Sequence, residues 1–339
     1  MASAPASKKT STRRKIENGP LIRVKNLKKY FPVHTEKFFH RQTRYARAVD
    51  GVSFELGRGK TLGLVGESGC GKTTMGRTLL RLEEPTAGSF FFDGNPVFDL
   101  KKEDMRRLRR RMQIIFQDPY SSLNPRQAVG SIIGEAMKIH RIGSRRERRE
   151  RTEWILTRVG LLPMDVNRYP HEFSGGGRQR IAIARAVAIR PDFIVCDEPV
   201  SALDVSIQAQ IINLLEELQG EFQLSYLFVA HDLHVVRHIS DEVAVMYLGK
   251  IVERASTDEL FEAPLHPYTR ALLAAVPRTE PGADNGGRVI LGGDIPSPLN
   301  PPRGCAFHTR CPEVIRDCAR LVPRHREISE GHWVSCIRV

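Results

Sequence analysis

Short apolar runs alternate with helix-like segments through the middle of the chain. The runs are rich in Val, Ile, Leu and Phe and are too short for buried helices, which predicts strands that are buried on both faces. Four such strands are expected, at 61–65, 114–116, 193–196 and 226–230. Amphipathic patterns at 73–81 and 179–189 predict helices between them. Alternating strands and helices indicate an α/β fold with a parallel sheet, whose ligand lies at the carboxyl ends of the strands.

The pattern is different at the amino-terminal end. Residues 1–20 are polar and basic without periodicity, which predicts a flexible tail. A strand is expected to begin at 21–24. A long polar insertion then follows Phe31, and apolar residues resume only at Ala48.

Two further changes of pattern divide the rest of the chain. From about 121 to 172, amphipathic helices rich in Arg and Glu predict a separate helical subdomain. From 262 to 339, repeated prolines indicate a loop-rich C-terminal appendage. We therefore expect the main domain to cover 21–261, with the helical subdomain inside it.

Composition and charge narrow the class of protein. The 339 residues are 41% hydrophobic and 27% charged, as in a soluble globular protein. No apolar stretch reaches the ~20 residues that span a bilayer, and the first residues lack an apolar secretory core, so we expect a cytoplasmic location. The net charge of +13 lies largely in local basic runs. Such runs are typical of solvated helix faces, and direct nucleic-acid binding is not expected from charge alone.

A glycine-rich motif, GxxxxGK[ST], lies between the strand expected at 61–65 and the helix expected at 73–81. Its glycines let consecutive backbone N–H groups point at phosphate oxygens, and the helix adds the positive end of its dipole. Lys72 would neutralise the β and γ phosphates of ATP, and Thr73 would bind Mg²⁺. The expected nucleotide contacts are Gly66, Glu67, Ser68, Gly69, Cys70, Gly71, Lys72, Thr73 and Thr74.

Polar residues end three other expected strands. Asp197 follows a buried run, where it can hold the Mg²⁺ shell, and Glu198 can polarise a water aligned with the γ-phosphate. Gln117 and His231 each end a strand, within reach of the metal, the attacking water or the γ-phosphate. Each residue alone is explained as well by a solvated turn or a structural role. Their common occurrence after the glycine-rich motif indicates ATP hydrolysis.

A second glycine-rich motif, Ser174-Gly175-Gly176, lies far along the chain from the first. One nucleotide needs only one phosphate cradle. We therefore expect the two halves of each ATP site to come from different subunits of a face-to-face dimer.

In this order, the motifs resemble those of the nucleotide-binding subunit of an ABC transporter, over roughly 21–339. The resemblance implies a P-loop NTPase with a RecA-like parallel sheet and an ABC-type helical subdomain. Phe31 falls where the family has an aromatic residue that stacks on adenine, with Tyr30 as the alternative. The other implied roles are Q-loop and Mg²⁺ contact for Gln117, signature for Ser174-Gly175-Gly176, Walker B for Asp197-Glu198, D-loop for Ser201 to Asp204, and switch residue for His231.

Segments at 116–125, 266–272 and 296–305 resemble the oligopeptide/dipeptide (and nickel) importer branch. The resemblance implies a subunit at the cytoplasmic face of the membrane that hydrolyses ATP to drive import of di- and oligopeptides. The implied partners are a second, related ATPase subunit, two membrane permeases and an extracytoplasmic peptide-binding protein. The region from Tyr120 to Ile139 is the expected docking surface for a permease. A soluble ABC ATPase acting on nucleic acid or ribosomes is the alternative, although this chain lacks the second cassette or long coiled coil usual in such proteins.

One residue departs from the family pattern. The signature usually continues with Gln after its two glycines, and this chain has Gly177. Glycine in the first turn of a helix costs up to ~1 kcal/mol relative to a better helix former. We expect a usable but loosened signature, which affects the site completed by this motif and not the site built on Lys72.

Four of the six cysteines lie in the last 35 residues, separated by 5, 6 and 17 residues. These spacings differ from the close CxxC pairs of zinc ribbons, and disulfides are disfavoured in a cytosolic protein. Four thiolates on irregular loops can hold an iron–sulfur cluster, and the resemblance implies a 4Fe-4S cluster here. Zn²⁺, free structural thiols and a redox switch of the ATPase stay open as alternatives. The candidate ligands are Cys305, Cys311, Cys318 and Cys336.

Overall fold

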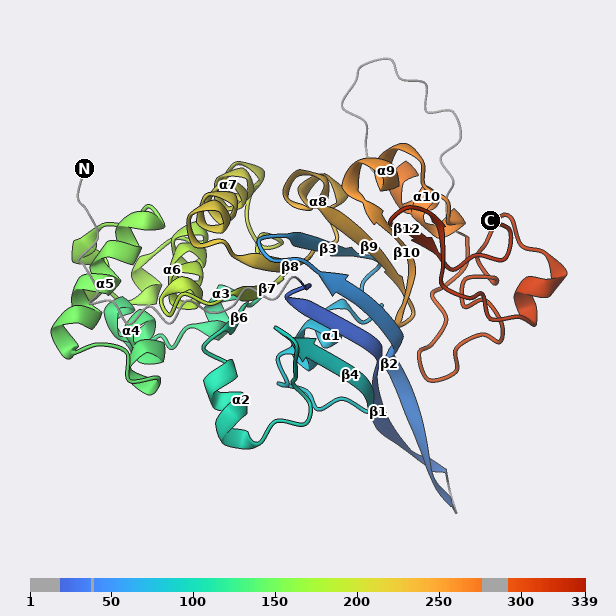
Figure 1. Ribbon diagram of the computed structural model, residues 1–339, viewed down its shortest axis with the longest axis horizontal. Coiled ribbons are helices and arrows are strands. Elements are labelled where there is room, and N and C mark those ends of the chain that lie inside the picture. Colours follow the sequence, from blue (N-terminus) through green and yellow to red (C-terminus); the bar gives the residue numbers. More distant parts are fainter. Residues whose placement is uncertain (1–18, 38–39, 276–291) are drawn as a thin grey trace.

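The computed structural model describes residues 19–37, 40–275 and 292–339. Its centre is an eight-stranded sheet in the order β11-β12-β10-β9-β3-β8-β7-β6 (Figure 1). The strands are β3 Thr61–Val65, β6 Met112–Ile115, β7 Phe193–Asp197, β8 Ser225–Val229, β9 Glu242–Tyr247, β10 Lys250–Ser256, β11 Arg326–Ser329 and β12 His332–Val334. From β9 to β6 all neighbours are parallel, and β10, β12 and β11 extend this sheet with antiparallel pairs. The expected parallel α/β sheet is confirmed.

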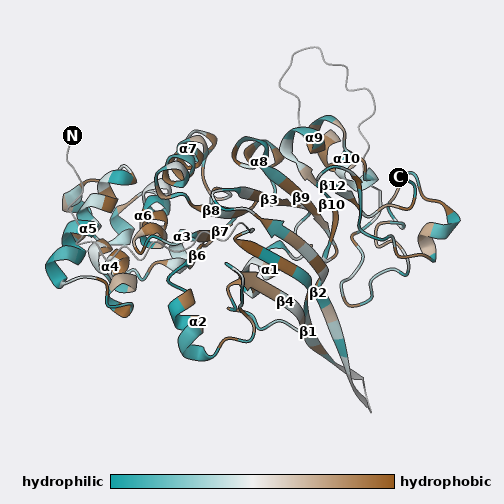
Figure 2. Ribbon diagram, in the orientation of Figure 1, coloured by the Kyte–Doolittle hydropathy of each residue, from teal (hydrophilic) through white to brown (hydrophobic). Residues whose placement is uncertain are grey.

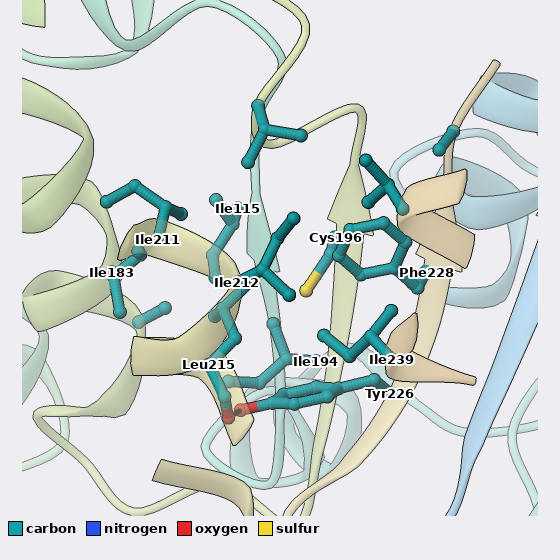
Figure 3. Packing of buried hydrophobic residues seen from close by; sticks show 14 of the residues in the cluster. Ile115, Ile183, Ile194, Cys196, Ile211, Ile212, Leu215, Tyr226, Phe228 and Ile239 are labelled. Atoms are coloured by element: carbon teal, nitrogen blue, oxygen red, sulfur yellow. Dashed lines mark hydrogen bonds between the residues drawn. The ribbon is translucent and has the colours of Figure 1, made fainter. Parts of the chain in front are cut away.

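Buried aliphatic and aromatic side chains fix the central strands between layers of helices. Every residue of β3, β7 and β8 is buried, as the continuous apolar runs predict. Figure 3 shows Ile194 and Phe228 of these strands packed with residues of α6 (Gly175–Val187) and α7 (Val205–Phe222). The hydroxyl of Tyr226 donates a hydrogen bond to the Leu215 carbonyl oxygen at 3.0 Å, so α7 is also held by a polar contact. This packing holds the carboxyl ends of the strands in fixed positions.

A second, antiparallel sheet has the order β2-β1-β4-β5. The polar insertion after Phe31 is not a loop: β1 and β2 form one long hairpin that projects from the body (Figure 1). The ladder runs past Tyr30 and Arg47 to Lys37 and His40. Polar residues on both faces give this part of the hairpin no apolar alternation, which is why the sequence did not predict it. The strands are β1 Ile22–Lys37, β2 His40–Leu56, β4 Ala87–Phe92 and β5 Asn95–Pro96.

Helices gather beside the β6 end of the main sheet, as expected for the helical subdomain (Figure 1). They are α3 Pro119–Ser122, α4 Val129–Ile139, α5 Arg145–Arg158, the 3-10 helices η1 Pro163–Asn167 and η2 Pro170–Glu172, and α6, with α2 Lys102–Leu108 nearby. Ser144 and Glu147 form a capping box that begins α5. Figure 2 shows that α5 is largely hydrophilic, in agreement with a solvated helix for its basic run. Among the described residues, no helix is long and apolar enough to cross a membrane.

The C-terminal region returns to the main sheet after a loop-rich path. Helices α8 Leu233–Ile239 and α9 Thr257–Glu262 precede it, and its own helices are α10 Pro267–Ala274 and the 3-10 helix η3 Arg316–Ala319. β12 pairs with β10, where Glu253 lies opposite Val334 and Arg254 opposite Trp333. The appendage is therefore joined to the cassette by a shared sheet. Its predicted boundary at 262, like those of the tail and helical subdomain, stays a prediction, and residues 1–18 of the tail lie outside the described residues.

Candidate nucleotide-binding site

The phosphate loop connects β3 to α1 (Lys72–Leu79), as the motif predicts. Two of its glycines are required by close backbone neighbours. A Cβ atom at Gly66 would lie 2.2 Å from the Met246 carbonyl oxygen, and one at Gly71 would lie 2.0 Å from that of Ala48. Both glycines also have positive φ angles, 153° and 110°. The loop is thus pressed against β2 and the end of β9.

Lys72 is buried at the first turn of α1. Its Nζ donates to the carbonyl oxygens of Gly66, at 2.7 Å, and Glu67, at 3.1 Å. The carbonyl oxygens of the loop therefore hold the ammonium group in place. The N–H groups of the same loop are the expected contacts of a phosphate.

A cavity of about 370 Å³ opens beside the loop. It brings together residues from five separate parts of the chain, most of them predicted. Ala48, at the base of the hairpin, was missed because an alanine carries no chemical signal. The lining residues are Ala48, Ser68, Gly69, Gly71, Lys72, Thr73, Thr74, Gln117, Glu198 and His231.

Thr73 and Asp197 meet beside this cavity. The Thr73 hydroxyl donates to Asp197 Oδ1 at 2.7 Å, across 124 positions of sequence. Burial raises the pKa of the Asp197 carboxyl. A cation at this point would oppose that shift, and a hydroxyl beside a carboxylate is a donor set that suits Mg²⁺. The predicted pair therefore fits Mg²⁺ chemically.

Gln117, Glu198 and His231 form a second polar group in the cavity. Gln117 Nε2 donates to Glu198 Oε2 at 3.0 Å, and His231 Nδ1 lies 3.3 Å from the same oxygen. Glu198 has a positive φ of 47°, just after the end of β7, and its N–H donates to the Val229 carbonyl oxygen on β8. The three residues follow β6, β7 and β8, so the parallel sheet explains why they converge.

The signature and the D-loop lie elsewhere. Ser174 caps α6 and accepts a hydrogen bond from the Gly177 N–H at 3.2 Å, and Asp204 caps α7 and accepts one from the Ile207 N–H at 3.0 Å. Ser174, Gly175, Gly176 and Asp204 are not among the described residues that line the cavity. Figure 1 shows α6 with the helical subdomain and α1 beneath the central sheet. The structure thus separates the two glycine-rich motifs.

The two aromatic candidates for adenine lie on β1. Phe31 is half-buried, and Lys29 Nζ lies 4.5 Å from its ring centroid. Tyr30 donates its hydroxyl hydrogen to Asp50. Neither residue is among the described residues that line the cavity, so adenine stacking on Phe31 or Tyr30 stays a prediction.

Contacts from the C-terminal region reach the phosphate loop, and the sequence did not predict them. Arg310 Nη1 and Nη2 donate to the two carboxylate oxygens of Glu67 at 2.7 and 2.9 Å. The Glu67 N–H donates to the Tyr268 hydroxyl oxygen at 3.0 Å. Arg310 is one of many arginines in the chain, so no local pattern marks it.

The four C-terminal cysteines are free thiols. Burial raises the pKa of Cys305 to about 11, and the negative charge that Cys318, Cys336 and Cys311 carry as thiolates adds to the rise. The Cys305 N–H donates to the Cys318 carbonyl oxygen at 2.7 Å. Within the described parts of the chain, no group of three or more His, Cys, Asp or Glu residues is placed to hold a metal ion. Neither a 4Fe-4S cluster nor a Zn²⁺ site at these thiols has support from the described residues.

A phosphate loop, a Walker B strand end and a detached signature on an α/β core define an ATP-binding cassette. Residues 49–201 match the ABC transporter family, and residues 252–318 match the C-terminal region of oligopeptide/dipeptide transporters. The chain therefore belongs to the ABC transporter family, in its oligopeptide/dipeptide branch. The resemblance described above is confirmed.

Relatives and solved structures agree with this assignment. The chain is 54% identical over 318 residues to the oligopeptide transport ATP-binding protein AppF of Bacillus subtilis, which covers 93% of this chain and 96% of AppF. It is 48% identical to the dipeptide transport ATP-binding protein DppF of Haemophilus influenzae, over 95% and 98% of the two chains. A dimeric ATP-binding cassette, MJ0796, solved with ADP and Pi, has a TM-score of 0.61 at 27% identity and matches 70% of this chain and 98% of its own.

Proposed function

We propose that this chain is the ATP-hydrolysing subunit of an importer of di- and oligopeptides. The observation that carries the proposal is the single cavity in which the phosphate loop meets Gln117, Glu198 and His231. Hydrolysis of a bound nucleotide needs a phosphate cradle and a group that orients water, and this cavity offers both. The peptide assignment is supported by what the relatives' names say they transport.

Each residue of the cavity has a distinct proposed role. Lys72 and the loop amides bind the phosphates, and Thr73 with Asp197 holds Mg²⁺, which supplies positive charge at the phosphate oxygens. Glu198 is the general base, because it is the carboxylate at the end of β7 that faces the cavity. His231 lies 3.3 Å from that carboxylate and senses the γ-phosphate, and Gln117 links Glu198 to the segment that begins the helical subdomain.

The separation of the two motifs supports a face-to-face dimer. Ser174 and Asp204 are exposed, and Val205 beside Asp204 is an apolar side chain that is 82% exposed. A partner subunit that covers this surface would receive the signature at its own phosphate loop. One similar cassette, MJ0796, is a dimer in two solved structures, which agrees with the arrangement. We propose a second, related ATPase as the partner.

The remaining partners follow from the branch. We propose that two membrane permeases bind the pair of ATPases at the cytoplasmic face of the membrane, and that an extracytoplasmic binding protein delivers the peptide. The docking surface for a permease is the region from Tyr120 to Ile139. Tyr120 is 62% exposed and Ile139 is 47% exposed.

The four C-terminal cysteines are proposed to hold a 4Fe-4S cluster. The proposal rests on the resemblance to the oligopeptide/dipeptide branch, whose matched C-terminal region includes Cys305, Cys311 and Cys318. The cluster would cross-link a segment that has little regular structure. Iron and acid-labile sulfide, measured on protein purified without oxygen, test this proposal, and Cys318→Ser should lower both. Zinc alone, or no metal, would contradict it.

The transport proposal is tested by Glu198→Gln in a reconstituted complex with its permeases. Loss of the general base should lower ATP hydrolysis and tripeptide uptake by roughly 100-fold or more, while ATP binding is retained. Glu217→Gln, which changes an exposed carboxylate on α7, is the matched control. Uptake that survives without hydrolysis, or recovery of the chain with nucleic acid instead of permeases, would overturn the proposal.

A further inference from the structure

We infer that Arg310 is a positioning residue for the phosphate loop, through which the C-terminal extension sets the affinity for ATP. Arg310 holds the carboxylate of Glu67 with two parallel hydrogen bonds, of 2.7 and 2.9 Å. Its side chain is 5% exposed, so solvent screens the pair weakly. The inference rests on the proposed nucleotide site.

Glu67 is held by its backbone as well as by its side chain. Its N–H donates to the hydroxyl of Tyr268, a fully buried residue of α10, at 3.0 Å. Its carbonyl oxygen accepts from Lys72 Nζ at 3.1 Å. A displacement of Glu67 therefore changes the position of the lysine that is proposed to bind the phosphates.

The charge of Glu67 needs a partner for an electrostatic reason. A free carboxylate in this loop would repel a polyphosphate and compete with it for the loop N–H groups and for Lys72. A bidentate arginine fixes the carboxylate and neutralises it. Removing one member of such a shielded pair leaves the other charge uncompensated, so the effect of losing Arg310 exceeds that of losing an exposed pair.

Aromatic packing ties this arginine to the cassette. The rings of Tyr247, Tyr268 and Phe307 form a cluster with centroid separations of 4.7, 5.2 and 5.3 Å. The Arg310 guanidinium lies 5.9 Å from the Tyr247 ring centroid. Arg310 also lies between Cys305 and Cys311 in the chain, so whatever orders those thiols also orders the arginine. The extension thus reaches the loop at two points, through Arg310 and through Tyr268 of α10.

The test is the steady-state ATPase of the full complex with Arg310→Gln. The KM for ATP should rise about tenfold while kcat changes less than about threefold, because the lost interaction serves ground-state binding. Arg310→Lys keeps the charge without the bidentate geometry and should give an intermediate KM. Arg324→Gln, at an exposed arginine of the same extension, is the matched control.

A double variant separates positioning from general destabilisation. In Arg310→Gln with Glu67→Gln, no unpaired carboxylate faces the phosphates, so the KM should return to within about threefold of the wild-type value. Metal content and Tm are measured on every variant. An unchanged KM in Arg310→Gln, an equal rise in Arg324→Gln, or a double variant no better than the single one would overturn the inference. A wild-type complex without ATPase activity would instead overturn the proposed function.

Discussion

The two glycine-rich motifs of this chain are built in opposite ways. The phosphate loop is enclosed: Lys72 is 5% exposed, Glu67 is held by Arg310 and Tyr268, and two glycines lie against neighbouring backbone. The signature is open, with an exposed Ser174 at the end of α6. An enclosed motif can bind a ligand by itself, whereas an exposed cap becomes part of a site only when another surface covers it.

This difference supports the proposal that the two motifs belong to different half-sites. The phosphate loop, Gln117, Glu198 and His231 line one cavity of the chain itself, and Asp197 lies beside it. We propose that the signature serves a partner's nucleotide. If the partner is a different subunit, the two composite sites are unequal, since Gly177 alters only the one that receives this signature.

The largest expected effect comes from a change in the enclosed motif, the phosphate loop. Lys72→Ala removes the ammonium group held at the loop, and ATP hydrolysis by the complex should fall about 100-fold or more. Steady-state ATPase and tripeptide uptake measure the loss, with Lys102→Ala on the exposed face of α2 as the control. A loss of less than tenfold would show that the other half-site carries turnover alone.

Acid should destabilise α10, the helix that contacts the phosphate loop through Tyr268. His266 caps α10, the helix of Tyr268, by accepting the Tyr268 N–H at Nδ1, and burial lowers the pKa of His266 to about 3. Because this pKa lies below the unfolded value of about 6.5, the unfolded chain binds the proton first. The stabilisation is complete above pH 6.5 and falls as the pH falls towards 3.

The size of this effect follows from the two pKa values. By pH 5 the loss relative to pH 8 should be about 2 kcal/mol in the free energy of unfolding. Urea denaturation at both pH values measures it. His266→Asn keeps a capping side chain that does not titrate and should remove this part of the pH dependence. An identical pH dependence in the two proteins would show that His266 is protonated in the folded state.

A smaller effect is expected from a change in the open motif, the signature. Ser174→Ala removes the cap of α6, worth about 1 kcal/mol, and a side chain proposed to contact the partner's γ-phosphate. ATPase of the assembled dimer should fall about fivefold. Ser144→Ala, which removes the comparable cap of α5, is the matched control and should leave the rate per dimer unchanged. Equal losses in both variants would mean that Ser174 acts only as a cap.

The sequence predicted the central part of the fold well because its strands are buried on both faces. β3 and β7 lie within one residue of their expected bounds, since a continuous apolar run between polar ends has few other solutions. The hairpin of β1 and β2 was missed between Phe31 and Ala48, because the many polar residues in this part of the sequence leave no periodic signal.

The functional site likewise has residues that the sequence predicted and a contact that it did not. The sequence alone predicted that residues after parallel strands, such as Gln117 and His231, lie close together, because the carboxyl ends of such strands share one edge. The contact between Arg310 and Glu67 spans 243 positions and joins an irregular segment to a loop. Neither periodicity nor a motif relates such residues, so only the folded chain shows it.

The smallest expected effect is at Gly177, where the family has Gln. Gly177→Gln adds a better helix former at the first turn of α6, a gain of about 0.5–1 kcal/mol. The structure sets a cost against this gain, because a Cβ atom at Gly177 would lie 3.1 Å from Phe173 Cβ and 3.2 Å from its Cδ1, closer than ordinary contact. With the two effects opposed, ATPase of the complex should change less than about threefold. A gain as large as the loss from Lys72→Ala would reverse the comparison, since the half-site that receives this signature would then limit turnover.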